Sequence, residues 1–105
     1  MQSRAGVILL LFDLPNETAK ERRDYAAFRK HIIKRGYVMI QKSVYVKYLR
    51  NIASSESELA ELDVFAPSAG GVAAIPLNVS NFSKFRSLRG CGFDLDSFIS
   101  EIVTI

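Results

Sequence analysis

Asp13 lies at the end of a predicted strand, a position that often carries a functional side chain. Asp13 follows the apolar run from Val7 to Phe12 and precedes Leu14 and Pro15. An unbroken apolar run is typical of a central strand covered on both faces, and strand ends that open into loops often carry functional side chains. A carboxylate there can bind Mg²⁺ or another divalent cation, one of whose waters could attack a phosphodiester. The alternative is that Asp13 only satisfies the backbone of the turn.

A lone carboxylate is a poor metal site, which favours a symmetric pair of Asp13 residues across a dimer. The chain has one histidine, His31, and one cysteine, Cys91, so neither a zinc cluster nor a Ser-His-Asp arrangement can be argued. We interpret His31 as a surface residue of a helix. We interpret Cys91 as a free thiol, which fits a reducing compartment.

The second chemical signal lies on a predicted helix. Thr18 and Glu21 form a capping box, and Gly36 supplies a left-handed stop, so a helix is expected over Thr18 to Arg35. At about 100° per residue, one face carries the side chains that should pack on a sheet, namely Tyr25, Phe28 and Ile32. The opposite face therefore points to solvent.

That outer face is basic. Lysines and arginines follow its centre and flanks: Lys20, Arg22, Arg23, Arg29, Lys30, Lys34 and Arg35. Only Glu21 and Asp24 oppose them on the helix, and a stripe of one sign is most easily explained by contact with a phosphate backbone. The candidate nucleic-acid ligands are Lys20, Arg22, Arg23, Arg29, Lys30 and Lys34. No Asn or Gln accompanies them, which favours binding that ignores base sequence. The alternative is a solvated face.

Charge across the whole chain supports a polyanionic partner. Residues 1–50 hold 11 of the 14 lysines and arginines and 4 of the 11 acids, giving +7, whereas residues 51–105 hold the remaining 3 and 7, giving −4. Nucleic acid is favoured over membrane, because the longest apolar run is too short to span a bilayer and no signal peptide is evident. We expect a single domain, since 105 residues provide one core. Because no signal peptide or membrane span is evident, we expect the protein to be cytoplasmic.

Further elements follow along the chain. Residues 37–49 are rich in Val, Ile and Tyr and are interrupted at residues 41–43, which predicts a bent strand or a short hairpin. Ser55 and Glu58 suggest a second capping box, followed by a helix that ends before Pro67. Residues 71–77 read as a strand, and Pro76 argues that part of it lies at a sheet edge.

The order strand-helix-strand-strand-helix-strand predicts an α+β, ferredoxin-like fold with both helices on one face of a sheet. Residues 1–80 would form the core, and residues 81–105 an extension of the same domain. The apolar segment Ile102 to Ile105 is expected to form an additional C-terminal strand. That strand would pair with the sheet of a second subunit and make a homodimer.

Three segments together resemble a known family. They are residues 10–15 (LLFDLP), the helix with Arg22-Arg23, Tyr25 and Phe28-Arg29-Lys30, and residues 36–45 (GYVMIQKSVY). Their order and spacing are similar to those of the CRISPR-associated adaptation protein Cas-two (Cas2), in the version found in type II systems. The likeness covers the first half closely and continues more loosely through Leu77, Phe82 and Phe85.

This resemblance implies a symmetric homodimer that bridges two dimers of the CRISPR integrase, Cas-one (Cas1). It would hold a duplex DNA prespacer and set the length of DNA inserted during spacer integration. The resemblance also implies a metal-dependent endonuclease activity on RNA or double-stranded DNA, with Mg²⁺ as cofactor and Asp13 as the catalytic, metal-ligating aspartate. Ser43 and Tyr45 match positions near that aspartate. Residues 87–98 follow no family pattern.

Two hypotheses of different classes therefore stand together. In the first, the chain is an architectural, DNA-binding subunit of an integration complex, supported by the basic stripe. In the second, it is a metal-dependent phosphodiesterase, for which Asp13 is nearly the whole argument. A third interpretation, independent of the resemblance, is a stand-alone endoribonuclease or a toxin-like nuclease of ferredoxin fold, because such modules share this size and charge.

Overall fold

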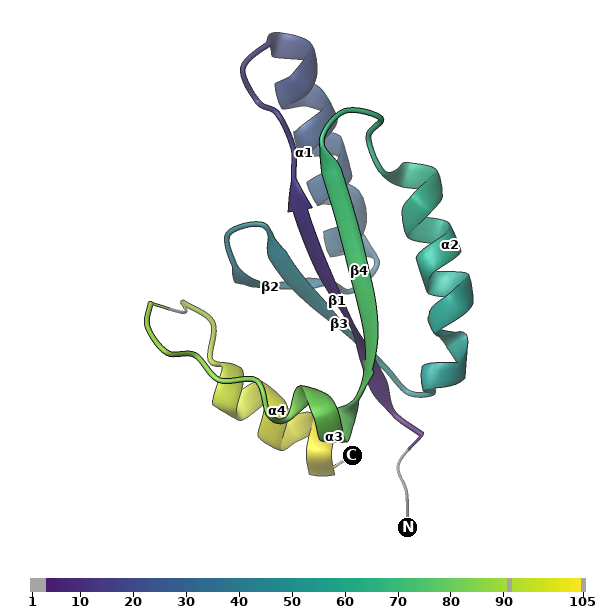
Figure 1. Ribbon diagram of the computed structural model, residues 1–105, viewed down its shortest axis with the longest axis vertical. Coiled ribbons are helices and arrows are strands. Elements are labelled where there is room, and N and C mark those ends of the chain that lie inside the picture. The colour runs from purple at the N-terminus through teal and green to yellow at the C-terminus, as the bar shows by residue number, and fades with distance from the viewer. Residues whose placement is uncertain (1–3, 91, 105) are drawn as a thin grey trace.

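Four antiparallel strands form one sheet in the order β2-β3-β1-β4 (Figure 1). The computed structural model describes residues 4–90 and 92–104. The strands are β1 (Gly6–Asp13), β2 (Val38–Gln41), β3 (Val44–Leu49) and β4 (Gly71–Asn78). The apolar run is thus the inner strand β1, paired with β3 on one side and β4 on the other. Pro76 lies in β4, which is an edge strand as predicted.

Helices cover the two faces of the sheet unequally. On one face lie α1 (Ala19–Lys34) and α2 (Ser55–Phe65), the latter preceded by the short helix η1 (Ile52–Ser54). On the other face lie α3 (Val79–Phe82) and α4 (Leu95–Thr104), which pack on only part of the sheet. This arrangement confirms the α+β, ferredoxin-like prediction. Among the described residues, no helix is long and apolar enough to cross a membrane.

Alternation along β1 divides the core into two layers. Side chains of successive strand residues point to opposite faces, so Ile8, Leu10 and Phe12 join α1 and α2 in one cluster. Val7 and Leu9 point the other way, toward Phe82 of α3 and the apolar side of α4. β1 is therefore packed on both faces along most of its length, as its unbroken apolar run predicted.

The prediction for α1 is confirmed in its details. The amide of Glu21 donates to Thr18 Oγ1 at 3.1 Å, and the amide of Thr18 donates to Glu21 Oε1 at 3.0 Å, which completes the capping box. The helix ends before Gly36, whose φ is 98°. Phe28 and Ile32 are buried against the sheet.

Residues 38–49 form a hairpin. Lys42 and Ser43 make the turn between β2 and β3, and the strand register shifts between Met39 and Gln41. The interruption read from the sequence therefore includes both a tight turn and a local irregularity in β2.

The predicted C-terminal strand was wrong. Residues 95–104 form α4, an amphipathic helix that packs against the sheet. Its apolar side chains recur at helical spacing, namely Leu95, Phe98, Ile99 and Ile102, and the amide of Ser97 donates to the Asp94 carboxylate at 3.1 Å near the helix start. The β-branched run of residues 102–104 suggested a strand, but the periodicity of the longer segment decides the structure. Ile105 lies outside the described residues, as does Cys91.

The predicted second capping box was also wrong. α2 begins after Ser54, which makes no side-chain cap, and the preceding helix η1 is capped by Asn51, whose side chain accepts from the amide of Ala53 at 3.0 Å. Glu58 instead points into the protein, where only 7% of its surface is exposed. The Glu58 side chain therefore makes long-range contacts and does not cap the start of α2.

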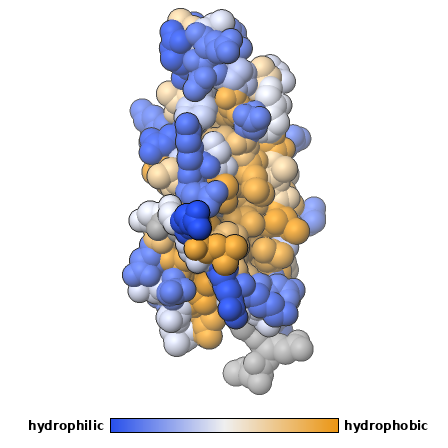
Figure 2. Space-filling view, turned by 60° about the vertical axis from the view of Figure 1, so that its left-hand side comes forward, coloured by the Kyte–Doolittle hydropathy of each residue, from blue (hydrophilic) through white to orange (hydrophobic). Residues whose placement is uncertain are grey.

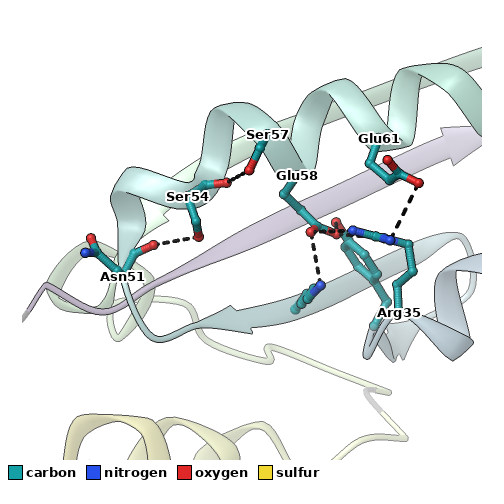
Figure 3. A network of polar contacts seen from close by, with 8 residues as sticks. Arg35, Asn51, Ser54, Ser57, Glu58 and Glu61 are labelled. Atoms are coloured by element: carbon teal, nitrogen blue, oxygen red, sulfur yellow. Dashed lines mark hydrogen bonds and ion pairs between the residues drawn. The ribbon is translucent and has the colours of Figure 1, made fainter.

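Glu58 is the centre of a buried polar network (Figure 3). Its carboxylate accepts from Arg35 Nη2 at 3.0 Å, Tyr37 Oη at 3.1 Å and Lys47 Nζ at 3.1 Å. Glu61 adds a longer ion pair of 3.6 Å with Arg35. The network ties α2 to the end of α1 and to β3.

The charges of this network shift pKa values, among them those of Glu58 and Tyr37. Burial alone would raise the pKa of Glu58, but hydrogen bonds from Arg35 and Lys47 outweigh it, so the pKa lies below its ordinary value. Burial and the Glu58 charge raise the pKa of the Tyr37 hydroxyl, which therefore stays protonated and keeps donating. The carboxylate is thus ionised and fully engaged at neutral pH.

We predict that Glu58→Gln lowers the free energy of unfolding by about 3 kcal/mol at neutral pH, because it removes the buried anion that pairs with the half-buried cations Arg35 and Lys47. The folded pKa lies below the ordinary value of 4.5, so this stabilisation is present above that pH and is lost as the pH falls through the folded pKa. Urea unfolding of wild type and variant across this range should show the difference shrinking in acid. Glu56→Gln, an exposed carboxylate on the same helical turn, is the control and should change stability by less than about 0.5 kcal/mol. A difference independent of pH would contradict the assignment.

Candidate functional site

Asp13 is the last residue of β1 and pairs with Gly71 of β4. Alternate residues of a strand point to the same face, so the Asp13 side chain shares a face with Leu9 and Leu11. This face is opposite to α1 and α2. The side chain is exposed. Among residues 4–90 and 92–104, no hydrogen bond or ion pair engages its carboxylate. A role in satisfying the turn backbone is therefore not seen in this part of the chain, and the carboxylate remains available.

The turn of the hairpin holds the end of β1 in place. The amide of Phe12 donates to the carbonyl of Ser43 at 3.1 Å, which carries the β1–β3 pairing one residue beyond the Leu11–Val44 pair. Ser43 has a φ of 64°, an unusual conformation for a residue with a side chain. Ser43 thus lies beside the residue that precedes Asp13, on the neighbouring strand connection.

Tyr45 supports Asp13 from inside the core. It is buried, and its ring stacks on Phe12 with 5.5 Å between the ring centres. Its hydroxyl accepts a hydrogen bond from Arg29 Nε at 3.1 Å. Because Phe12 and Asp13 point to opposite faces of the sheet, Tyr45 fixes the strand end and does not line the space around the carboxylate.

Sequence reasoning missed the role of Gly70. This residue has a φ of 88°, and a Cβ placed on it would lie 2.5 Å from the carbonyl oxygen of Asp13 and 2.9 Å from Pro15. The loop between α2 and β4 therefore packs directly on the turn that follows Asp13. The pair Gly70-Gly71 indicated only a chain turn, because a close approach between distant segments leaves no local signal.

Asp13 has the chemistry of a metal ligand but no cluster of ligands around it in the described part of the chain. Within the described segments, no group of three or more His, Cys, Asp and Glu side chains comes together. A single exposed carboxylate is a hard oxygen ligand of the type Mg²⁺ prefers, and Mg²⁺ normally keeps several waters. Asp13 therefore offers one ligand of the kind that a divalent cation binds.

Three of the six predicted nucleic-acid ligands are engaged within the protein. Arg22 donates to the carbonyls of Asn16 at 3.4 Å and Glu17 at 2.6 Å, and so fixes the loop before α1. Lys20 pairs with Asp24 at 2.8 Å. Arg29 donates to Tyr45 as described above. These cations have structural partners, although all three are exposed at the surface.

The other three, Arg23, Lys30 and Lys34, are exposed and unengaged. No ion pair or hydrogen bond to them is found in the part of the chain that the structure describes. The helical wheel places them on the outer face together with Lys20, which pairs with Asp24, whereas Arg22, Arg29 and Arg35 lie on its flanks. The uncompensated charge of α1 is therefore concentrated along one line pointing away from the sheet.

The sheet face that carries Asp13 is partly open and apolar. Leu11 of β1 is 41% exposed and Ile75 of β4 is 46% exposed. Both lie beyond the area that α3 and α4 cover, and Figure 2 shows apolar side chains gathered on this side of the molecule. Clustered exposed apolar side chains of this kind commonly mark an interaction surface.

His31 is half-buried and is not the plain surface residue that the sequence suggested. Its ring stacks on Phe65 of α2 with 3.5 Å between the ring centres. Its buried Nε2 has no hydrogen-bond partner within the described residues. His31 belongs to the contact between α1 and α2, away from Asp13.

The family model for "CRISPR associated protein Cas2" matches residues 7–85. The chain belongs to the Cas2 family. The match runs from β1 through α3, so it includes Asp13, α1 and the hairpin, and it ends before α4. The resemblance to the Cas2 family that was read from the sequence is confirmed.

Curated relatives agree with this assignment. A protein named CRISPR-associated endoribonuclease Cas2 from Ligilactobacillus salivarius is 39% identical over 83 residues, which are 79% of this chain and 82% of the relative. Proteins of the same name from Streptococcus mutans and Treponema denticola are 34% and 32% identical over 83 residues, again 79% of this chain, and 78% and 82% of the relatives. Family membership supports a role in CRISPR systems, and the relatives' names support a nuclease activity.

We predict that Gly70→Ala lowers the free energy of unfolding by about 2–3 kcal/mol, because the new methyl group meets the Asp13 carbonyl in a conformation that side chains disfavour. The change should also shift the amide resonances of residues 12–14. Gly71→Ala is the control, since nothing lies within 4 Å of a Cβ at that position. Equal effects of the two substitutions would show that the Gly70 contact does not hold the turn.

Proposed function

We propose that this protein acts in CRISPR adaptation as a dimeric scaffold that binds duplex DNA and bridges dimers of the integrase Cas1 during spacer integration. The observation that carries the proposal is the row of unengaged cations on α1, namely Arg23, Lys30 and Lys34. A row of one sign that finds no partner within the described chain is suited to a phosphate backbone. Membership in the Cas2 family supports the same function.

A homodimer would cover the open apolar sheet face and would supply a second Asp13 carboxylate. The open sheet face exposes Leu11 and Ile75, and a second copy related by two-fold symmetry would cover the same face on each subunit. Because Asp13 shares that face, such packing would bring two Asp13 carboxylates toward each other. The α1 helices would then lie on the outside of the dimer, free to contact DNA.

Nuclease activity is the second function that we propose, on the strength of the relatives' names and of the available Asp13 carboxylate. A divalent cation such as Mg²⁺ would supply a bound water of lowered pKa and would neutralise phosphate charge. The two carboxylates would hold the cation, while the Ser43 turn and the Phe12 side chain would keep each strand end in place. The reaction would be hydrolysis of a phosphodiester in RNA or DNA.

The alternative to a scaffold is a stand-alone endoribonuclease or a toxin-like nuclease. It is favoured by the same names and the same carboxylate, and it requires no integrase partner. In that case Asp13 would be essential for the biological activity, and the α1 row would serve only to attract substrate.

Replacing Arg23, Lys30 and Lys34 with Gln should weaken binding to a duplex of arbitrary sequence. The slope of log affinity against log salt should fall by about 0.9 for each phosphate that the variant no longer neutralises. The measurement is fluorescence anisotropy over a range of salt concentrations. Arg4→Gln with Arg50→Gln is the control pair, because both side chains are exposed near the start of β1, at the far end of the sheet from Asp13. An unchanged slope in the triple variant would show that the row is a solvated face.

The variant Asp13→Asn should distinguish the scaffold function from the nuclease function. The substitution keeps the size of the side chain but removes the charge that a hard cation needs, so any metal-dependent cleavage should disappear. We expect the same variant to remain dimeric by light scattering, to bind duplex with wild-type affinity and to support spacer integration with Cas1 supplied.

Thermal unfolding of the Asp13→Asn variant controls for misfolding. Loss of integration in a folded, dimeric variant that still binds duplex would overturn the scaffold proposal and place Asp13 at the centre of the mechanism. A monomeric wild type at micromolar concentration would instead overturn the shared site.

A further inference from the structure

A second basic surface lies at the edge of the region that the family model matches and extends beyond it. All three basic residues of the second half of the chain fall within six positions, namely Lys84, Arg86 and Arg89. They belong to the connection between α3 and α4, which extends from the sheet at the left of Figure 1. We call residues 84–90 the basic loop. Its three cations are exposed, and among the described residues no ion pair involves them.

The basic loop adjoins the tip of the β2–β3 hairpin. Gly90, at the end of the loop, lines a groove of about 320 Å³ together with Met39, Gln41 and Lys42 of the hairpin. Lys42 is also exposed, so it adds a fourth cation to this end of the molecule. The surface is distinct from the row on α1, because α1 lies on the opposite face of the sheet.

Leu88 stands out within the basic loop. It is 93% exposed, the highest value among the large apolar residues described. Moving a leucine side chain out of water is favourable, so a partner that covers Leu88 would gain affinity. The two flanking arginines, Arg86 and Arg89, would repel each other and attract an anion.

The chemistry of the loop favours nucleic acid over a protein partner. A protein interface normally has a buried core of several apolar side chains, whereas this loop exposes one large apolar residue between cations. Proteins that bend or kink duplexes use a similar combination, with arginine or lysine on the backbone and an apolar wedge against the base stack. The small residues Ser87 and Gly90 would let the loop backbone approach closely.

Two carboxylates lie near the loop and reduce its net charge. Asp94 and Asp96 share a groove with Arg86 between the loop and α4. The Asp94 carboxylate is hydrogen-bonded to the amide of Ser97 at 3.1 Å, so it serves α4. Four cations against two carboxylates leave this end of the molecule positive.

We propose that the basic loop is a second DNA contact, in which Arg86 and Arg89 bind phosphates and Leu88 covers the exposed face of a base pair. That face exists at the end of a duplex or at an internal step that has been unstacked. The proposal rests on the proposed function, since it adds a contact to a protein that already binds duplex through α1. It assigns a role to Leu88 and Arg89, which lie in the segment that follows no family pattern.

The test compares two loop variants with wild type on a linear duplex carrying 2-aminopurine at its terminal pair or at an internal pair. Arg86→Ser with Arg89→Ser should reduce the salt slope by about 0.9 for each phosphate that is no longer neutralised. Leu88→Ser should lower affinity about tenfold with the slope unchanged, and should abolish the change in 2-aminopurine fluorescence on binding. A terminal signal identifies the duplex end as the site, and an internal signal identifies an unstacked step. Val64→Ser, at a residue of α2 that is 75% exposed, is the control and should behave as wild type.

The outcomes separate this inference from the function on which it rests. If wild type binds duplex with a salt slope that the α1 variant reduces, but neither loop variant changes binding or fluorescence, the loop inference is overturned and the proposed function stands. If Leu88→Ser fails to capture Cas1 while keeping wild-type DNA binding, the loop is a protein contact and the inference is also overturned. If wild type does not bind duplex at all, both fail together.

Discussion

The packing of Phe12 is the interaction on which the arrangement of the site depends. Its ring meets Tyr25 and Phe28 of α1 at 6.0 and 5.4 Å between ring centres, and Tyr45 of β3 at 5.5 Å. This cluster joins α1, β1 and β3 at the end of the inner strand. Because neighbouring strand residues point to opposite faces, fixing Phe12 in the core also fixes the direction of Asp13. The packing of the buried Phe12 ring thus determines where the exposed Asp13 carboxylate lies.

Whether a cation of α1 has a partner within the protein depends on its position around the helix. Side chains on the flanks of the helix can reach the preceding loop, the hairpin and α2, and there Arg22, Arg29 and Arg35 find oxygen partners. Side chains along the centre of the outer face can reach none of these. The sequence pattern therefore identified a basic helix correctly, but only the structure separates the cations that hold the fold from those free to bind a partner.

Local signals predicted much of the fold. The capping box of Thr18, the unbroken run of β1 and the interruption at residues 41–43 all act within a few residues, so the chain folds there as the pattern indicates. Glu58 did not follow its local pattern, because ion pairs with Arg35 and Lys47 gain more in the core than a helix cap gains at the surface. The C-terminal segment failed for a similar reason: β-branched residues favour strands weakly, whereas a ten-residue amphipathic helix buries a whole face. For the candidate site, residue types could be predicted but not their relations. Asp13 was found because it ends an apolar run, and Ser43 was placed near it only by the family resemblance, whereas the support from Gly70 acts through a segment distant in the chain.

The two proposed activities use opposite sides of the sheet. The unengaged cations of α1 point away from it on one side, whereas Asp13 and the open apolar area lie on the other. In the proposed dimer, the Asp13 faces would turn inward toward each other and the α1 rows would turn outward. A duplex held along the α1 rows would then lie a full protein layer away from the carboxylates, so binding there would not by itself expose the duplex to cleavage. This separation gives a physical reason for a scaffold to retain a potential hydrolytic site without destroying the DNA it carries.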